Sequence, residues 1–176
     1  MRWVGLVRNV MLGREGLGRE LLLRLTLDAG GADPRSFLTT GNVAFTAEPD
    51  HLAEVVDTLE TGIAGVLGRR EVVVVRSRDW LGDLVAADPF QGYDRDAYEL
   101  EVCFIPHTAP PLVAADLPDS RPTLLVEVRD HELLTARPHS RASLPHGNRL
   151  LERATGRPAT ARAWSTLQRI HAHDHV

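Results

Sequence analysis

Arginine side chains are the residues of this sequence best suited to bind a ligand. Arg8 and Arg14 border the segment after the first apolar stretch, and Arg141 lies in PHSRASL. Thr160 is predicted to cap the last helix, which places Arg162 in its first turn, where the helix dipole disfavours a cation. A guanidinium group binds carboxylates and phosphates through its planar fork, so Arg8, Arg141 and Arg162 are predicted to bind an anion if they converge. The alternative for each is a salt bridge to one of the 24 acidic residues.

Two asparagines and a tryptophan complete the candidate ligand-binding residues. Asn9 lies in the same predicted loop as the first arginine. The pair Gly41-Asn42 in TTGNVAF is typical of a two-residue hairpin turn; alternatively, the strand begins at Asn42 and its amide points over the sheet. Trp164 offers a stacking surface for a ligand, although its spacing with later apolar residues favours the inward face of a helix.

Catalytic candidates are confined to one predicted loop. His139, Ser140 and His146 supply bases and a nucleophile there, but only hydrogen-bond geometry activates a serine. The sequence contains no glycine-flanked nucleophile, phosphate-binding loop or dinucleotide fingerprint. We therefore expect no cofactor, and an enzyme would use acid and base groups in a cleft between two halves.

Metal-binding patterns are weak. Cys103 is the only cysteine, so neither an internal disulfide nor a thiolate cluster is possible, and its apolar surroundings in ELEVCFI favour a buried thiol. His171 and His175 stand four residues apart, a helical spacing that allows a shared metal ion, but they belong to a terminal tail. The sequence predicts no metal site.

Charge and hydropathy argue against two classes of protein. The net charge of −4 and the pI near 6.0 argue against a nucleic-acid backbone as the main partner. No apolar run approaches the roughly 20 residues that span a bilayer, and the N-terminal segment lacks the features of a secretory signal. We expect a soluble, cytoplasmic protein with no membrane partner.

Periodicity in residues 1–76 predicts a ferredoxin-like βαββαβ sandwich, with both helices on one face of an antiparallel sheet. Apolar and β-branched runs predict four strands in RWVGLVRNV, RSFLTT, NVAFTA and EVVVVR. One helix is expected in LGRELLLRLTLDAGG, with Leu17, Leu21, Leu25 and Ala29 on its inner face, and another from about Asp50 to Gly68.

Residues 77–176 predict a second, smaller α+β subdomain with C-terminal helices. Ser77 is a predicted cap for a helix in RDWLGDLVAADPF, which Pro89 ends. Strands are expected in YELEVCFIP, PTLLVEV and HELLTA, and helices in GNRLLERATG and ATARAWSTLQRIHA.

The chain contains four blocks in this order: GLVRNV, FLTTGNVAFT, VVVVRSRDWLGDLVAADPF and LERATGRPATARAWSTLQRI. With them it resembles the bacterial domain-of-unknown-function 1697 family over essentially its whole length. The resemblance implies a ferredoxin-like N-terminal half followed by a smaller α+β half. It implies no particular activity, because the family is defined by lacking an assigned one.

Two segments depart from the family pattern. Residues 8–14 read RNVMLGR, where family members typically show Arg-Gly-Ile-Asn-Val-Gly-Gly, so a loop able to wrap an anion with backbone amides becomes bulkier. Residues 162–166 read RAWST, which keeps the Arg, Trp and Thr of the family's Arg-Asn-Trp-Asn-Thr and loses both amides. These losses suggest a specialised or degenerate member.

Three functions follow from the sequence. The first is binding of a small anionic or polar metabolite in a cleft between the two halves. The second is a cofactor-independent enzyme in a bacterial metabolic pathway. The third is a homo-oligomeric interaction module.

Overall fold

The computed structural model of the chain describes residues 1–139 and 146–173, and it consists of two compact units. Residues 1–82 and 170–173 belong to the first unit, and Asp83–Arg169 forms the second. The division expected after residue 76 differs from this at the boundary and in the C-terminal segment. Each unit contains a four-stranded antiparallel sheet. The α+β fold expected from the sequence is therefore confirmed.

The first sheet has the strand order β2-β3-β1-β4. Its central strand β1 pairs with β3 on one side, where Val4 faces Ala44, and with β4 on the other, where Val4 faces Arg76. The elements of this unit are β1 (Arg2–Val7), α1 (Arg19–Asp28), β2 (Ala32–Phe37), β3 (Asn42–Thr46), a short 3₁₀ turn (Pro49–His51), α2 (Leu52–Leu67) and β4 (Val73–Ser77).

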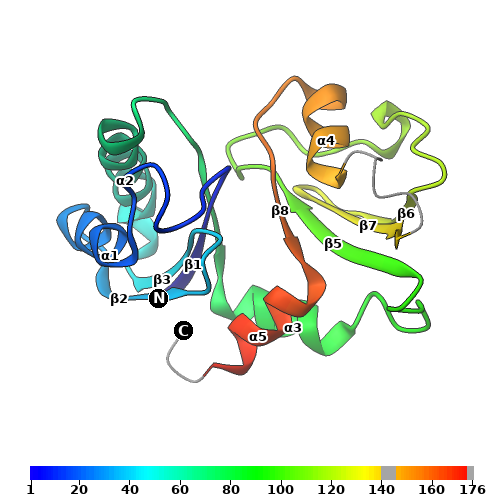
Figure 1. Cartoon of the computed structure of the whole chain (residues 1–176), viewed down its shortest axis with the longest axis horizontal. Coiled ribbons are helices and arrows are strands. Elements are labelled where there is room, and N and C mark those ends of the chain that lie inside the picture. The colour runs from blue at the N-terminus through cyan, green and yellow to red at the C-terminus, as the bar shows by residue number, and fades with distance from the viewer. Residues whose placement is uncertain (140–145, 174–176) are drawn as a thin grey trace. The chain divides into compact units, whose positions relative to one another are not determined.

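Helices α1 and α2 lie side by side against the same face of this sheet (Figure 1). Leu22, Leu59 and Ile63 from the helices and Phe45 from β3 are fully buried between these layers. The predicted inner face of α1 holds in part: Leu17 and Ala29 are buried, and Leu21 and Leu25 pack partly buried against the core. The fully buried leucine within α1 is Leu22. The end of α2 agrees with the sequence, since Gly68 adopts the left-handed conformation with φ of +67°.

The second sheet has the strand order β6-β7-β5-β8. The remaining elements of the chain are α3 (Arg78–Ala87), β5 (Tyr98–Phe104), a 3₁₀ turn (Ala114–Asp116), β6 (Leu124–Val128), β7 (Glu132–Pro138), α4 (Gly147–Thr155), β8 (Thr160–Ala163) and α5 (Trp164–Ala172). None of the helices in the described ranges is long and apolar enough to cross a bilayer.

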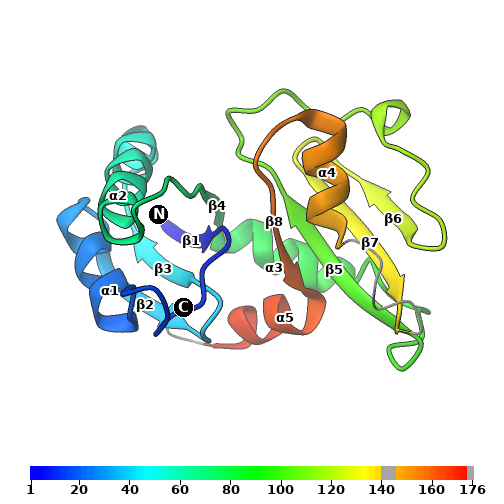
Figure 2. The ribbon, with the colours of Figure 1, turned by 45° about the horizontal axis from the view of Figure 1, so that its top comes forward.

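Helix α4 packs on one face of the second sheet, over β5 and β7 (Figure 2). Its first residue, Gly147, allows this close approach. A Cβ atom at that position would lie 2.5 Å from Sγ of Cys103 and 2.9 Å from Oγ1 of Thr135. Leu151 continues the contact and joins Cys103 in a buried apolar cluster. The glycine therefore fixes the start of α4 against β5.

The segment expected to begin the last helix is a strand instead. Residues 160–163 form β8, in which Ala161 pairs with Cys103 and Arg162 pairs with Val102. Burial alternates along this strand, with Thr160 and Arg162 buried. Pairing with β5 satisfies the backbone groups of these residues, and α5 begins only at Trp164. The prediction that Arg162 lies in the first turn of a helix was therefore wrong.

Candidate functional site

A cavity of about 430 Å³ lies in the second unit, where β5 begins and β8 passes into α5. This volume is within the range of about 300–1,000 Å³ that is usual for small-molecule sites. Leu100 and Ala163 contribute apolar wall. The side chains able to form hydrogen bonds are those of Arg95, Tyr98, Glu99, His139, Trp164 and Ser165.

Among the predicted ligand-binding residues that the structure describes, Trp164 alone lines this cavity. It is the first residue of α5 and is only 2% exposed. Its ring packs against Phe90 at 5.4 Å between centroids. Its indole N–H is buried and has no hydrogen-bond partner among the residues that the structure describes. Because a buried indole N–H usually finds an acceptor, this side chain belongs to the core and carries a donor that is unsatisfied among the described residues.

His139 lines the same cavity from the end of β7. Its backbone N–H donates to the carbonyl of Ala97 at 2.9 Å, and its Nε2 lies 3.3 Å from the carbonyl oxygen of Arg95. The side chain is exposed. This places a titratable imidazole in the cavity lining. Ser140, which was predicted to act beside it, lies outside the described residues.

Glu99 connects the cavity to a second group of polar residues. It pairs across the strands with Arg137, whose guanidinium forms an ion pair with its carboxylate. Glu101 follows two residues later on the same face of β5 and is 4% exposed. The carboxylate of Glu101 accepts a hydrogen bond from Nδ1 of His146 at 2.6 Å, in the tautomer that protonates this nitrogen. The potential ligand atoms of Glu99, Glu101 and His146 all lie within 4.8 Å of one another.

The position of His146 follows from the packing of α4. His146 is the N-cap residue of this helix, and the next residue, Gly147, lies against β5. The backbone N–H of Gly147 points at Oε2 of Glu101 at 3.4 Å. Sequence analysis missed this group because His146 and Glu101 are 45 residues apart. The one signal in the sequence was the pair of glutamates in the otherwise apolar strand YELEVCF.

Cys103 lies on the same strand but offers no reactive thiolate. Complete burial raises the pKa of its thiol well above the usual value, and the negative charge of Glu101 raises that pKa further. The thiol therefore stays protonated and behaves as a small core residue. This agrees with its predicted role.

Three arginines were predicted to share an anion, and the two that the structure describes each have surroundings of their own. Arg162 is 6% exposed in β8, and burial lowers the pKa of its guanidinium to about 10. Its Nη1 donates to Oγ1 of Thr160 and to the carbonyl of Ala161, both at 2.8 Å. Arg8 belongs to the first unit, and Arg141 lies outside the described residues. The shared anion site stays a prediction.

Comparison with known proteins gives a family and a fold. Residues 1–131 match the family described as "Protein of unknown function (DUF1697)". The chain belongs to this family. No curated protein matches the chain. The conserved bacterial protein SP0830 from Streptococcus pneumoniae has a similar structure, with a TM-score of 0.71, 15% sequence identity and coverage of 97% of this chain and 96% of that chain. At this identity the similarity shows the fold alone.

The DUF1697 match includes only part of the candidate site. Glu99 and Glu101 lie within the matched residues, whereas His139, His146 and Trp164 follow residue 131. The family therefore assigns no role to the cavity. An assignment for this DUF1697 protein has to come from the chemistry of its own side chains.

The loop after β1, where this DUF1697 chain departs from the family pattern, is held by ion pairs. Arg8 binds the buried carboxylate of Glu71 at 2.8 Å, and Arg69 binds the same carboxylate at 3.0 Å. Asn9 has a φ of +49°, and with its amide oriented to satisfy both groups its oxygen accepts from Nη1 of Arg8 at 2.6 Å. A salt bridge, the alternative given for each arginine, is what Arg8 forms.

Asn42 closes the loop between β2 and β3. The strand begins at Asn42, and Gly41, with φ of +68°, ends the preceding turn. The amide nitrogen of Asn42 donates to the carbonyl of Phe37 at 2.9 Å and to Oγ1 of Thr40 at 3.1 Å. The loop therefore spans residues 38–41, and the predicted two-residue turn at Gly41-Asn42 is wrong. The strand begins at Asn42, as in the alternative, and the amide contacts of Asn42 stabilise the loop.

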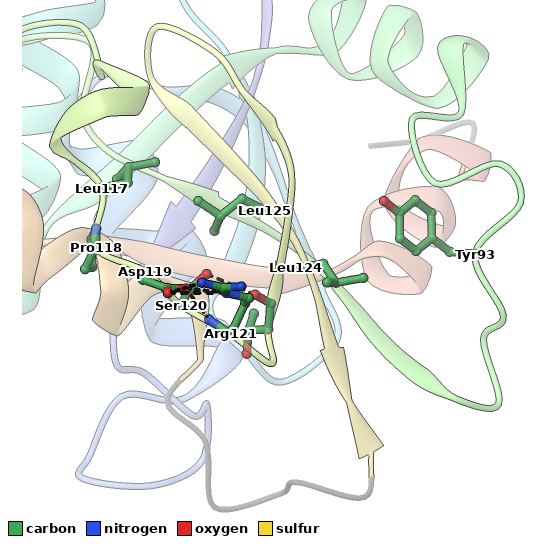
Figure 3. Close-up of a pocket in the computed structure, with 9 residues that line it drawn as sticks. Tyr93, Leu117, Pro118, Asp119, Ser120, Arg121, Leu124 and Leu125 are labelled. Atoms are coloured by element: carbon green, nitrogen blue, oxygen red, sulfur yellow. Dashed lines mark hydrogen bonds and ion pairs between the residues drawn. The ribbon is translucent and has the colours of Figure 1, made fainter.

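A second cavity, of about 420 Å³, lies beside the edge strand β6 of this DUF1697 protein. Figure 3 shows Asp119, Ser120 and Arg121 close together, with Leu125 nearby. The carboxylate of Asp119 pairs with Arg121 at 2.8 Å, and the hydroxyl of Ser120 donates to the backbone. Because these polar groups already bind one another or the backbone, the Trp164 cavity is the better candidate.

Proposed function

We propose that this protein binds a small polar or anionic metabolite in the cavity lined by Trp164. The observation that carries the proposal is the buried indole N–H of Trp164, which has no acceptor among the described residues. An unsatisfied buried donor costs about 1–3 kcal/mol, so a ligand that offers an acceptor atom recovers this free energy. Such a ligand has a carboxylate, phosphate, carbonyl or amide oxygen.

Other lining groups support a polar ligand. Tyr98 and Ser165 carry hydroxyl groups, and Arg95 and His139 supply further donors. The negative charge of Glu99 is paired with Arg137, so it does not repel an anion as a free carboxylate would. The apolar wall formed by Leu100 and Ala163 suits a short hydrocarbon portion.

Removal of the indole N–H tests the proposal directly. A thermal-shift panel of acetate, succinate, inorganic phosphate and acetamide at constant ionic strength identifies a stabilising probe. Calorimetry then compares its affinity for the wild type and for Trp164→Phe, which keeps an aromatic ring. We expect affinity to fall roughly 2- to 10-fold, the equivalent of one neutral hydrogen bond. The unliganded variant should lose some stability, because the smaller ring leaves a cavity in the core, and this loss is measured separately from the change in probe affinity.

Trp80→Phe is the matched control. Trp80 lies in α3 of the first unit and does not line the cavity. Its substitution should leave probe affinity unchanged. The proposal is wrong if no compound of the panel binds, or if both substitutions weaken binding equally.

Acid–base catalysis in the same cavity is a second candidate. It is favoured by the presence of both Glu99 and His139 in the lining. Mass spectrometry of a bound compound after incubation separates the two functions, because an enzyme changes the mass of the compound and a binding protein does not. Homo-oligomerisation and a cytoplasmic location stay predictions.

A further inference from the structure

Glu99, Glu101 and His146 form a group with the chemistry of a metal site. They come from β5 and from the start of α4, and their potential ligand atoms lie within 4.8 Å of one another. We propose that these three side chains bind one divalent transition-metal ion. The proposal goes beyond the metabolite cavity, with which it shares only Glu99.

The ligand types favour a borderline ion such as Zn²⁺. One imidazole nitrogen and two carboxylate oxygens form a mixed set that zinc accepts readily. Three protein ligands also leave at least one coordination position for water or for another molecule, as in catalytic zinc sites. Because Glu99 also lines the cavity, that open position would lie close to the proposed metabolite.

Regular elements hold the three side chains in place. Glu99 and Glu101 project from the same face of a strand that pairs on both sides, with β7 and with β8. His146 precedes Gly147, which is fixed against β5 by its lack of a side chain. A metal site requires such support, because its ligands must stay near coordination distance before the ion arrives.

Arg137 provides support of the kind found behind metal ligands. It is buried on β7 and forms an ion pair with Oε2 of Glu99. A hydrogen bond from such a partner orients a ligating carboxylate. Substitution of the partner typically lowers metal affinity by about 10- to 100-fold. That ion pair involves Oε2, and the other oxygen of Glu99 could coordinate the ion.

The competing account is a pair of ordinary ion pairs, Arg137 with Glu99 and His146 with Glu101. In that account the imidazole of His146 satisfies the buried carboxylate, and no ion is needed. The two accounts differ in one measurable respect. One equivalent of zinc that binds tightly and depends on both Glu101 and His146 is expected only if these side chains act as ligands.

Titration of the whole, chelator-treated chain with Zn²⁺ by calorimetry tests the proposal, with Co²⁺ absorption as an independent report of coordination. We expect one equivalent to bind, and affinity to fall at least 10-fold in Glu101→Gln and in His146→Gln, because loss of a ligand should cost no less than loss of a supporting residue. The side chain of His146 is 51% exposed, so its substitution should preserve the fold. His107→Gln, at an exposed histidine of the same unit that does not line the cavity, should leave zinc affinity unchanged.

The histidines near the C-terminus are a second possible source of zinc binding. A double substitution, His171→Gln with His175→Gln, removes the pair spaced four residues apart and should leave the one-equivalent site intact. The proposal is overturned if that double variant abolishes binding, if His146→Gln binds zinc as tightly as the wild type, or if the wild type binds no zinc. If Glu101→Gln fails to fold, His146→Gln decides the question. Trp164→Phe retains all three ligands, so failure of the metabolite proposal leaves this result unaffected.

Discussion

Gly147→Ala should destabilise the second unit, because the new methyl group meets the sheet. Its Cβ would lie 2.5 Å from Sγ of Cys103 and 2.9 Å from Oγ1 of Thr135. The first distance is about 1 Å shorter than the separation at which nonbonded heavy atoms attract. Thr135 belongs to the central strand β7, so the helix must move away from the sheet or the side chains must leave their rotamers.

The magnitude follows from two opposing terms. Forcing an extra methyl group into a packed core costs about 1–3 kcal/mol, while replacing a helical glycine by alanine gains about 0.5–1 kcal/mol. The central values of the two terms leave a net loss of about 1 kcal/mol, which corresponds to a fall in melting temperature of roughly 2–4 °C for a protein of this size. Urea denaturation followed by circular dichroism measures the free energy of unfolding.

A double-mutant cycle with Cys103→Ala makes this prediction specific. Cys103→Ala alone should cost about 1 kcal/mol, a typical value for a single substitution. In the double variant the methyl group at position 147 occupies space left by Sγ, so the combined loss should be smaller than the sum by about 1 kcal/mol. The remaining contacts with Thr135 make the rescue partial.

Gly65→Ala is the matched control for the glycine effect. Gly65 is exposed within α2, and a Cβ atom there meets nothing within 4 Å. This substitution should stabilise the protein by about 0.5–1 kcal/mol. Additive losses in the Cys103 and Gly147 cycle, or equal effects of the two glycine substitutions, would refute the packing argument.

Two further predictions concern carboxylates. Glu60→Ala should lower the free energy of unfolding, measured by urea denaturation, by about 1–3 kcal/mol, because Oε1 of buried Glu60 accepts the N–H of Val73 at 2.9 Å. Asp57→Ala is an exposed control and should change this free energy by less than about 0.5 kcal/mol. Equal losses in the two variants would contradict this account. The side-chain hydrogen bond from Arg121 lowers the pKa of Asp119 from 3.8 to about 2, so its stabilising contribution is present above pH 3.8 and is lost as the pH falls through 2. Arg121→Gln should return the pKa of Asp119, measured by NMR, toward 3.8, and an unchanged pKa would refute the assignment.

The sequence alone determined most of the first unit. Apolar periodicity predicted the order of strands and helices there, and Gly68 marked the end of α2. These features are local, because the periodic direction of side chains along an element and the left-handed conformation of a glycine each depend on only a few neighbouring residues. The three-residue spacing of Trp164, Leu167 and Ile170 is a local signal of the same kind and predicted an inward helical face. All three residues are buried.

Tertiary structure decided the conformation around Arg162. Four residues are too few for periodicity to distinguish a strand from the first turn of a helix. Hydrogen bonding to β5 made residues 160–163 a strand and buried Arg162 beside Thr160. The neighbouring strand, which is distant in sequence, therefore overrode the local preference for a helical cap.

Tertiary structure also decided the candidate sites. Glu101 and His146 are 45 residues apart, and they meet only because Gly147 lets α4 lie directly against β5. The spacing of Trp164 predicted its burial, but whether its N–H finds an acceptor depends on every element packed around it. Sequence patterns record which residues face inward along one element, whereas the contacts between elements follow from strand register and helix docking, which involve the whole unit at once.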